Sequence, residues 1–358
     1  MGCFQSGALK KVTQEPMIFG PSSAKKETLN TQRNIEENNQ IQKNVCSFST
    51  FVQQNENPTI FEWTFLNEIA KGSMSRVFIS KNIETGIKCA AKVYDKELLM
   101  RPTLGGEAPP YIAVQRELDI MASISHRYII PIIEIIEDDY TNSLIMLLPY
   151  ANKGSLQSYI DSEHPSEETL SICFYEIAES LRYLHSHNIV HRDIKPENIL
   201  IFTDTLFKLS DFSVSSKLDE PDQKLIDTRG SPAFLSPEEC EDDAFDPKRA
   251  DVWAYGITLF SCIFHFLPFR LELGQGRNVV STVFTVTHLL STEELDVPED
   301  KGFSPHLIAL LKNILQKDPN KRPSFEEIVK SEWFKKGKEI DKEMLENEEE
   351  EEEEMKEN

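Results

Sequence analysis

The stretch IVHRDIKPENIL, residues 189 to 200, constrains this chain more than any other part of its sequence. It places Asp193, Lys195 and Asn198 in one short loop, after a long helical pattern and before an apolar run. A carboxylate there can orient a hydroxyl or accept its proton, and a lysine can neutralise a phosphoryl group during transfer. An asparagine oxygen can bind magnesium, which prefers oxygen ligands. The loop therefore predicts a phosphotransferase site.

The sequence on the two sides of this loop predicts two different halves. Residues 61–80, 87–95 and 143–150 alternate or concentrate apolar side chains as strands do. After Gly154 the apolar spacing becomes helical, most clearly over residues 170–188, and residues 249–269 are apolar on all sides, as in a helix at the centre of a domain. A small strand-rich half followed by a larger helical half predicts an α+β fold.

Further residues occur in the order found in eukaryotic protein kinases, which the chain resembles over roughly residues 61–335. These residues are Lys92 in CAAKV, Glu117 in QREL, Asp211 in SDFS, Glu238 in SPE and Asp251 in DVWAYG. The resemblance implies a bilobal protein-kinase-like fold with a small β-rich N-lobe (59–148), a hinge (149–153) and a larger α-helical C-lobe (154–335). It also implies that Glu238 pairs with Arg322 and that Ser231 contacts the catalytic loop.

The same resemblance implies ATP and Mg²⁺ as cofactors and assigns residues to them. Catalysis falls to Asp193, Lys195 and Asn198, and metal binding to Asn198 and Asp211. Residues implied in nucleotide binding are Ile69, Ala70, Gly72, Val77, Ala90, Lys92, Glu117, Pro149, Ala151 and Leu200. Within this set, Glu117 is expected to form the ion pair that positions Lys92.

Three positions depart from the family pattern. Ala70 and Ser75 replace two glycines of the phosphate-covering loop, and Ser213 replaces the glycine that follows Asp211 and Phe212. Glycine supplies backbone freedom and close approach to phosphates, so we expect altered nucleotide binding. Every charged or metal-binding group is retained, which favours an active enzyme over the alternative, a membrane-tethered pseudokinase scaffold. A small-molecule kinase is disfavoured by the SPE segment.

The DIKPEN and GSPAFLSPE segments indicate a serine/threonine kinase that acts on proteins in signalling. Within that class the chain most resembles the calcium/calmodulin-dependent protein kinase kinases, which implies other kinases as substrates. The residues after Phe334 are acidic rather than a basic amphipathic helix, which argues against calmodulin control. Arg192 and Thr228 suggest an activating phosphate on Thr228, and an unmodified threonine is an equal alternative.

The two ends of the chain are expected to be disordered. Residues 1–58 are rich in polar residues, and residues 336–358 include a run of glutamates from Glu348 to Glu354. The start MGCFQSG fits N-myristoylation at Gly2, and Cys3 offers a palmitoylation site, so we expect the cytoplasmic face of a membrane. An unmodified N-terminus is the alternative.

The charge and the cysteines narrow the surroundings in which the chain works. The formal net charge is −22 and no basic stripe is evident, which argues against nucleic-acid binding. The six cysteines show no metal-ligand spacing, so we expect reduced thiols in the cytoplasm. No run of apolar residues is long enough to span a bilayer, and no signal peptide is expected.

Overall fold

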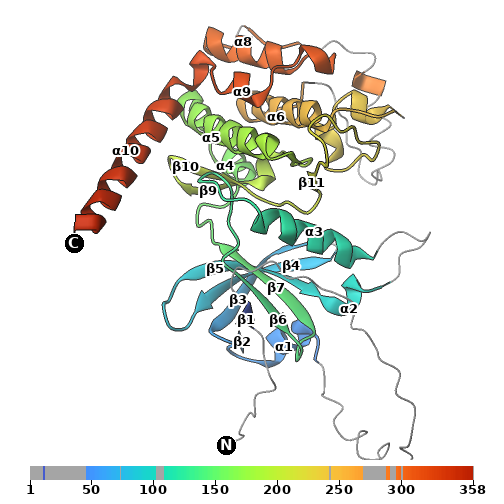
Figure 1. Ribbon diagram of the computed structural model, residues 1–358, viewed down its shortest axis with the longest axis vertical. Coiled ribbons are helices and arrows are strands. Elements are labelled where there is room, and N and C mark those ends of the chain that lie inside the picture. The colour runs from blue at the N-terminus through green and yellow to red at the C-terminus, as the bar shows by residue number, and fades with distance from the viewer. Residues whose placement is uncertain are drawn as a thin grey trace, which may run out of the picture. The chain divides into compact units, whose positions relative to one another are not determined.

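The computed structural model of the protein describes residues 11–12, 46–72, 74–101, 109–241, 243–268, 288–290, 296–299 and 301–357. The chain divides into two compact units. The first comprises Met1–Ala122 and Pro131–Tyr150, and the second comprises Ser123–Ile130 and Ala151–Asn358. The first unit is built on a β-sheet and the second is mostly helical, so the predicted α+β, bilobal kinase fold is confirmed (Figure 1).

Among its described residues, the first unit contains a seven-stranded antiparallel sheet and three helices. The strands follow the order β1-β6-β7-β5-β4-β3-β2. The elements are β1 (Lys11–Val12), α1 (Phe48–Gln54), β2 (Thr59–Ile60), β3 (Trp63–Lys71), β4 (Ser75–Asn82), β5 (Lys88–Asp95), α2 (Lys96–Leu99), α3 (Pro110–Ala122), β6 (Glu134–Asp138) and β7 (Ser143–Pro149). The hairpin predicted around the glycine-containing turn is present as β3 and β4.

The short helix α1 extends the ordered part of the first unit beyond its predicted start. Ser47 caps α1, because its side chain accepts a hydrogen bond from the Thr50 amide. Phe48 is buried and packs edge-to-face on Phe65, with the ring centroids 5.0 Å apart, and lies 5.3 Å from Phe78. The structure therefore differs from the disordered arm predicted up to residue 58, because apolar residues at 48–52 find a sheet face to cover.

The second unit is built around two long helices, α5 and α6. Its helices are α4 (Leu156–Ser162), α5 (Glu167–Ser186), α6 (Pro247–Phe264), α8 (Pro305–Ile314), α9 (Phe325–Ile328) and α10 (Lys335–Glu357). Its short strands are β8 (Ile189–Val190), β9 (Ile199–Thr203), β10 (Leu206–Leu209) and β11 (Ser216–Lys217). The 3-10 turns are η2 (Pro196–Asn198), η3 (Pro232–Phe234), η4 (Glu238–Cys240), η5 (Pro319–Lys321) and η6 (Glu332–Phe334).

Local sequence explains where these two helices begin and why they lie inside the unit. Ser166 caps α5, and two glutamates in its first turn stabilise the helix, because their negative charge lies at the positive end of the helix dipole. Asp246 caps α6, and Pro247 occupies its first turn, where no amide donor is needed. Nearly all of α6 is buried, as its apolar composition predicts.

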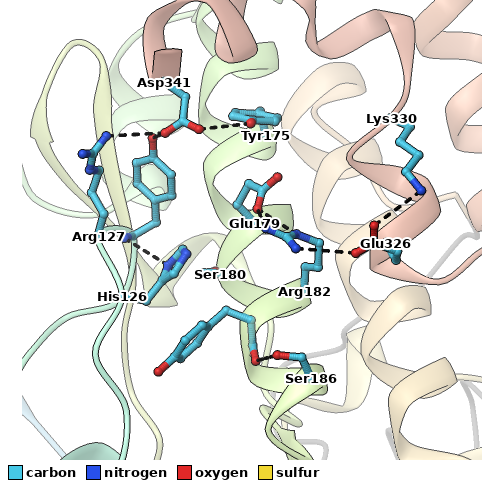
Figure 2. Close-up of polar contacts among 12 residues, drawn as sticks. His126, Arg127, Tyr175, Glu179, Ser180, Arg182, Ser186, Glu326, Lys330 and Asp341 are labelled. Atoms are coloured by element: carbon cyan, nitrogen blue, oxygen red, sulfur yellow. Dashed lines mark hydrogen bonds and ion pairs between the residues drawn. The ribbon is translucent and has the colours of Figure 1, made fainter. Parts of the chain in front are cut away.

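Helix α10 replaces the disordered tail predicted from residue 336. Its first turns rest on α5, where Gly337 lies so close to Tyr175 that an added Cβ would be 2.7 Å from the Tyr175 Cβ. Asp341 accepts a hydrogen bond from the Tyr175 hydroxyl at 3.2 Å and lies 3.5 Å from Arg127 Nη1 (Figure 2). It also accepts a hydrogen bond from the Tyr128 hydroxyl. The prediction considered only the charge of this segment, whereas these contacts give the helix a partner.

In the described ranges, no helix is both long and apolar enough to cross a membrane. Five of the six cysteines fall within the described residues, and all five are free thiols. The acylation residues Gly2 and Cys3 lie outside the described residues.

Candidate active site

In the first unit, Lys92 and Glu117 form a largely buried ion pair. Lys92 lies on β5 and Glu117 on α3, with 2.6 Å between Lys92 Nζ and Glu117 Oε1. The Tyr94 hydroxyl donates to the other oxygen of Glu117 at 2.9 Å. Burial raises the pKa of Tyr94, so this hydroxyl keeps its proton and remains a donor. The lysine is therefore held in one position by a carboxylate that is itself fixed.

The predicted nucleotide residues of the first unit form a row across its sheet. Register pairs Ala70 with Val77, Val77 with Lys92, and Lys92 with Met146. Residues directly opposite each other in antiparallel strands share a face, and so does Ala90, two residues before Lys92. One face of the sheet thus presents small and apolar side chains around one cation.

The remaining predicted nucleotide residues lie at the turn, at strand ends and in the second unit. In the β3–β4 turn, the Gly72 amide donates to the Ser75 carbonyl at 2.8 Å. Ile69 on β3 is exposed, and Pro149 ends β7 opposite Cys89. Ala151 and Leu200 belong to the second unit, where Leu200 lies on β9.

In the second unit, Asp193 is the centre of the catalytic loop. Its Oδ2 accepts from Lys195 Nζ at 2.7 Å and from Asn198 Nδ2 at 3.0 Å. Its Oδ1 accepts from the Ser231 amide at 2.9 Å, and Lys195 Nζ also donates to Ser231 Oγ at 2.7 Å. The three predicted catalytic residues therefore meet, and Ser231 contacts the loop as expected.

Asp251 of α6 fixes the backbone that precedes Asp193. Its two oxygens accept from the His191 amide at 2.9 Å and from the Arg192 amide at 2.8 Å. Burial works against its charge, but His185 and these two amides outweigh burial and hold the pKa of Asp251 below its usual value. The backbone of Arg192 has a positive φ of 69°, which residues other than glycine rarely adopt without such support.

The predicted metal residues lie on neighbouring segments. The Ser210 amide and hydroxyl both bond the Asn198 carbonyl at 2.9 Å, which ties the residue before Asp211 to the catalytic loop. Asn198 turns its nitrogen toward Asp193, so its side-chain oxygen is the atom left for a metal. An amide oxygen and a carboxylate fit Mg²⁺, which takes its other ligands from phosphates and water.

Ser213 is accommodated without strain in this conformation. Asp211 has a positive φ of 63°, whereas Ser213 is absent from the described non-glycine residues with positive φ. The preceding Phe212 is fully buried and packs on His191, with the ring centroids 5.0 Å apart. The special glycine freedom expected at position 213 is therefore not required here.

The activation segment, residues 211 to 238, carries a contact that sequence reasoning missed. The guanidinium of Arg192 meets Asp227, with 3.3 Å between Arg192 Nη2 and Asp227 Oδ1. The signal was the acidic Asp227 directly before Thr228, whereas the sequence suggested a phosphate on Thr228, with an unmodified threonine as the equal alternative. At the end of the segment, Glu238 bonds Arg322 at 2.5 and 2.7 Å, the pair implied by the resemblance.

Comparison with known proteins agrees with this geometry. The family model described as the protein kinase domain matches residues 63–334. The chain belongs to the protein kinase family. It is 31% identical over 281 residues to the serine/threonine-protein kinase GRIK1 of Arabidopsis thaliana, which covers 78% of this chain and 68% of that protein.

Two further relatives are also protein kinases. The maternal embryonic leucine zipper kinase of Xenopus tropicalis is 31% identical over 271 residues, covering 75% of this chain and 38% of that protein. The CBL-interacting protein kinase 26 of Oryza sativa is 29% identical over 275 residues, covering 76% of this chain and 52% of that protein. This kinase thus spans about half or less of these two relatives, and it is a protein serine/threonine kinase.

Proposed function

We propose that this kinase transfers the γ-phosphoryl group of ATP to serine or threonine hydroxyls of other proteins through the residues described above. The observation that carries the proposal is the arrangement of Asp193, Lys195, Asn198 and Ser231 around one carboxylate. Protein kinases as a family use ATP and Mg²⁺, which supply the phosphoryl group and neutralise its developing charge.

Each residue of the chain then has a defined part. Asp193 orients the substrate hydroxyl or accepts its proton, and the hydrogen bonds to its carboxylate keep it from rotating away. Lys195 places a cation beside the transferring group, while Asn198 and Asp211 provide metal ligands. Lys92, positioned by Glu117, holds the phosphates of the nucleotide.

Transfer of labelled phosphate from ATP and Mg²⁺ to a basic protein tests these roles. Asp193→Asn and Lys92→Met should each reduce turnover by about 1,000-fold or more, since the first removes the carboxylate that orients the substrate hydroxyl and the second the cation that holds the phosphates. Asp204→Asn is the matched control, because Asp204 is an exposed aspartate whose only described ion pair is to Lys153. Folded parent protein that binds nucleotide but transfers nothing would instead support the pseudokinase scaffold.

Ser213→Gly separates the active enzyme from the scaffold more finely. Because Ser213 needs no positive φ, restoring glycine should change turnover by about threefold or less. A large gain would show that the serine suppresses activity, as a scaffold would require.

We infer that the substrates include the activation segments of other kinases. The support is the resemblance of GSPAFLSPEE and DVWAYGITLF to the calcium/calmodulin-dependent protein kinase kinases. Catalytically inactive kinases should be phosphorylated on their activation-segment threonines faster than casein, as mapped by mass spectrometry. Equal rates on casein and on these kinases would remove the inference.

We further propose that Gly2 and Cys3 carry acyl chains that hold the kinase at the cytoplasmic face of a membrane. The support is the MGCFQS pattern, in which two adjacent acyl chains give stable anchoring where one gives only marginal binding. Gly2→Ala should abolish myristate labelling and release the protein from membranes, whereas Cys3→Ser should leave myristate in place but weaken retention.

A further inference from the structure

The guanidinium of Arg192 is buried and its partners come from the activation segment. The side chain is 3% exposed. Its Nη1 donates to Ser216 Oγ at 3.1 Å and lies 3.4 Å from Asp227 Oδ2. Its Nη2 lies 3.3 Å from Asp227 Oδ1 and also bonds the Asp227 carbonyl. A buried cation is costly without an anion, so Asp227 supplies the compensating charge.

Asp227 is well suited to this part because it stays ionised. Burial alone would raise its pKa, but Arg192 and Arg229 outweigh burial and lower it below the usual value. Arg229 Nε donates to Asp227 Oδ2 at 2.6 Å. Asp227 thus joins two arginines, as a phosphate group does when it orders a loop.

Thr228, for which the sequence left a phosphate and an unmodified hydroxyl equally open, bonds to another residue. Its hydroxyl donates to the Glu239 carbonyl at 2.7 Å. A phosphate on Thr228 would lose this bond and add negative charge next to Asp227, which already occupies the Arg192 guanidinium. Arg192 therefore already has an anionic partner without a phosphate on Thr228.

The contact at Asp227 is transmitted to the catalytic residues through a short span of chain. Gly230 has a φ of 97°, and an added Cβ would lie 2.2 Å from the Arg192 carbonyl. The next residue, Ser231, bonds both Asp193 and Lys195. Asp227 and Ser231 are thus two attachment points, on either side of Gly230, between the activation segment and the catalytic loop.

We propose that Asp227 is a positioning residue that replaces an activating phosphate. Its carboxylate holds Arg192 and thereby sets the activation segment so that Ser231 reaches Lys195 and Asp193. The kinase therefore reaches its working arrangement without phosphorylation of Thr228. This inference rests on the proposed transfer activity, and its test includes a readout that does not.

Four variants test the proposal: Asp227→Asn, Asp227→Glu, Thr228→Ala and Asp222→Asn. The last is the matched control, an exposed aspartate of the same segment with no described side-chain partner. For each variant, kcat, KM for ATP, thermal unfolding and the rate of tryptic cleavage after Lys224 and Arg229 would be measured. Asp227→Asn should lower kcat by about 10- to 100-fold, the loss of a charge-assisted contact, while KM for ATP changes by about threefold or less.

The other variants decide between the two sources of charge. Asp227→Glu should recover most of the kcat, and Thr228→Ala and Asp222→Asn should stay within about twofold of the parent. Tryptic cleavage should accelerate in Asp227→Asn alone, a result that does not require transfer activity. The proposal would be overturned if Thr228→Ala lowered kcat as much as Asp227→Asn does. It would also be overturned if Asp227→Asn and Asp222→Asn had the same kcat and the same rate of tryptic cleavage. If Asp227→Asn does not fold, Thr228→Ala decides: a kcat within about twofold of the parent supports the proposal, and a loss of about 10-fold or more overturns it.

Discussion

Two arginines of the helical unit are held by carboxylates in very different surroundings. Arg322 is fully buried and bonds both oxygens of Glu238, which is 13% exposed. It also donates to three backbone carbonyls and lies over the Trp253 ring. The Arg192 side chain is also buried, at 3% exposure, but its partner Asp227 is 44% exposed, and the Asp227 carboxylate lies 3.3 to 3.4 Å from the guanidinium.

This difference separates a pair that maintains the fold from a pair that sets activity. Breaking an ion pair with two buried partners leaves an uncompensated charge inside the protein. Asp227 is 44% exposed on the activation segment, so when its carboxylate is removed this segment can move and admit water to Arg192, and the loss costs less stability. The same chemistry therefore stabilises the domain at Arg322 and positions the activation segment at Arg192.

The largest effect is expected for Arg322→Met. It should lower the free energy of unfolding by about 3–5 kcal/mol, because Glu238 and three carbonyls lose their donor. The measurement is urea denaturation. Arg182→Met is the control, since the Arg182 side chain is 42% exposed and pairs with Glu179 and Glu326 (Figure 2), and it should cost less than about 1 kcal/mol. Equal losses would erase the distinction between buried and exposed pairs.

Glu239 follows Glu238 directly but has no arginine partner. Burial raises its pKa from 4.5 to about 7, although bonds from Ser236 oppose this rise. The folded state therefore holds a proton that the unfolded state releases, so this contribution to stability is full below pH 4.5 and is lost as pH rises toward 7.

Glu239→Gln should remove this dependence of the free energy of unfolding on pH, which amounts to at most about 3 kcal/mol over the whole range. Unfolding measured between pH 4.5 and 7.5 gives the comparison. Glu241→Gln, at an exposed glutamate two residues on, should keep the slope of the parent. Identical slopes in parent and Glu239→Gln would show that burial does not hold the proton.

Gly230→Ala tests the span between Asp227 and Ser231. A Cβ 2.2 Å from the Arg192 carbonyl must displace backbone, so turnover should fall by about 100-fold, equivalent to about 2.7 kcal/mol. Gly302→Ala controls for backbone strain alone, because Gly302 also has a positive φ but no atom within 4 Å of an added Cβ. Comparable activity in the two variants would mean that the segment does not depend on this close approach.

The smallest effect concerns the aspartate that holds α10. Asp341→Ala leaves the Tyr128 and Tyr175 hydroxyls without their acceptor and should cost about 1–2 kcal/mol. Glu339→Ala, whose ion pair to Lys336 is exposed and 3.9 Å long, should be neutral within about 0.5 kcal/mol in the same denaturation experiment. A neutral Asp341→Ala would show that the hydrogen bonds of Asp341 add nothing to the stability of the helical unit.

The sequence was most informative where chemistry and order coincide. Asp193, Lys195 and Asn198 lie close together because they share one loop, so their meeting followed from spacing alone. The Lys92–Glu117 pair joins a strand and a helix, and it was expected only through the resemblance to kinases. The fold class followed from the change in apolar spacing after Gly154.

Other features depend on tertiary partners that no local pattern reveals. Helix α1 is stabilised because Phe48 packs on Phe65 and Phe78, which lie on β3 and β4. Helix α10 begins in a charged segment, and its support comes from contacts of Asp341 with residues more than a hundred positions away. The Asp227–Arg192 contact was not predicted, because a phosphate on Thr228 or the carboxylate of Asp227 could supply the anion, and only the tertiary contacts show which one meets Arg192.

Turnover of phosphate-free protein tests the central claim most directly. The parent kinase would be treated with phosphatase and shown by intact mass to carry no phosphate. Phosphate transfer to a protein substrate that has no kinase activity of its own would then be measured at once. The account predicts initial turnover within about twofold of the untreated protein, because Asp227 already supplies the charge that Arg192 needs. Turnover that is absent at first and appears only as Thr228 becomes phosphorylated would contradict it.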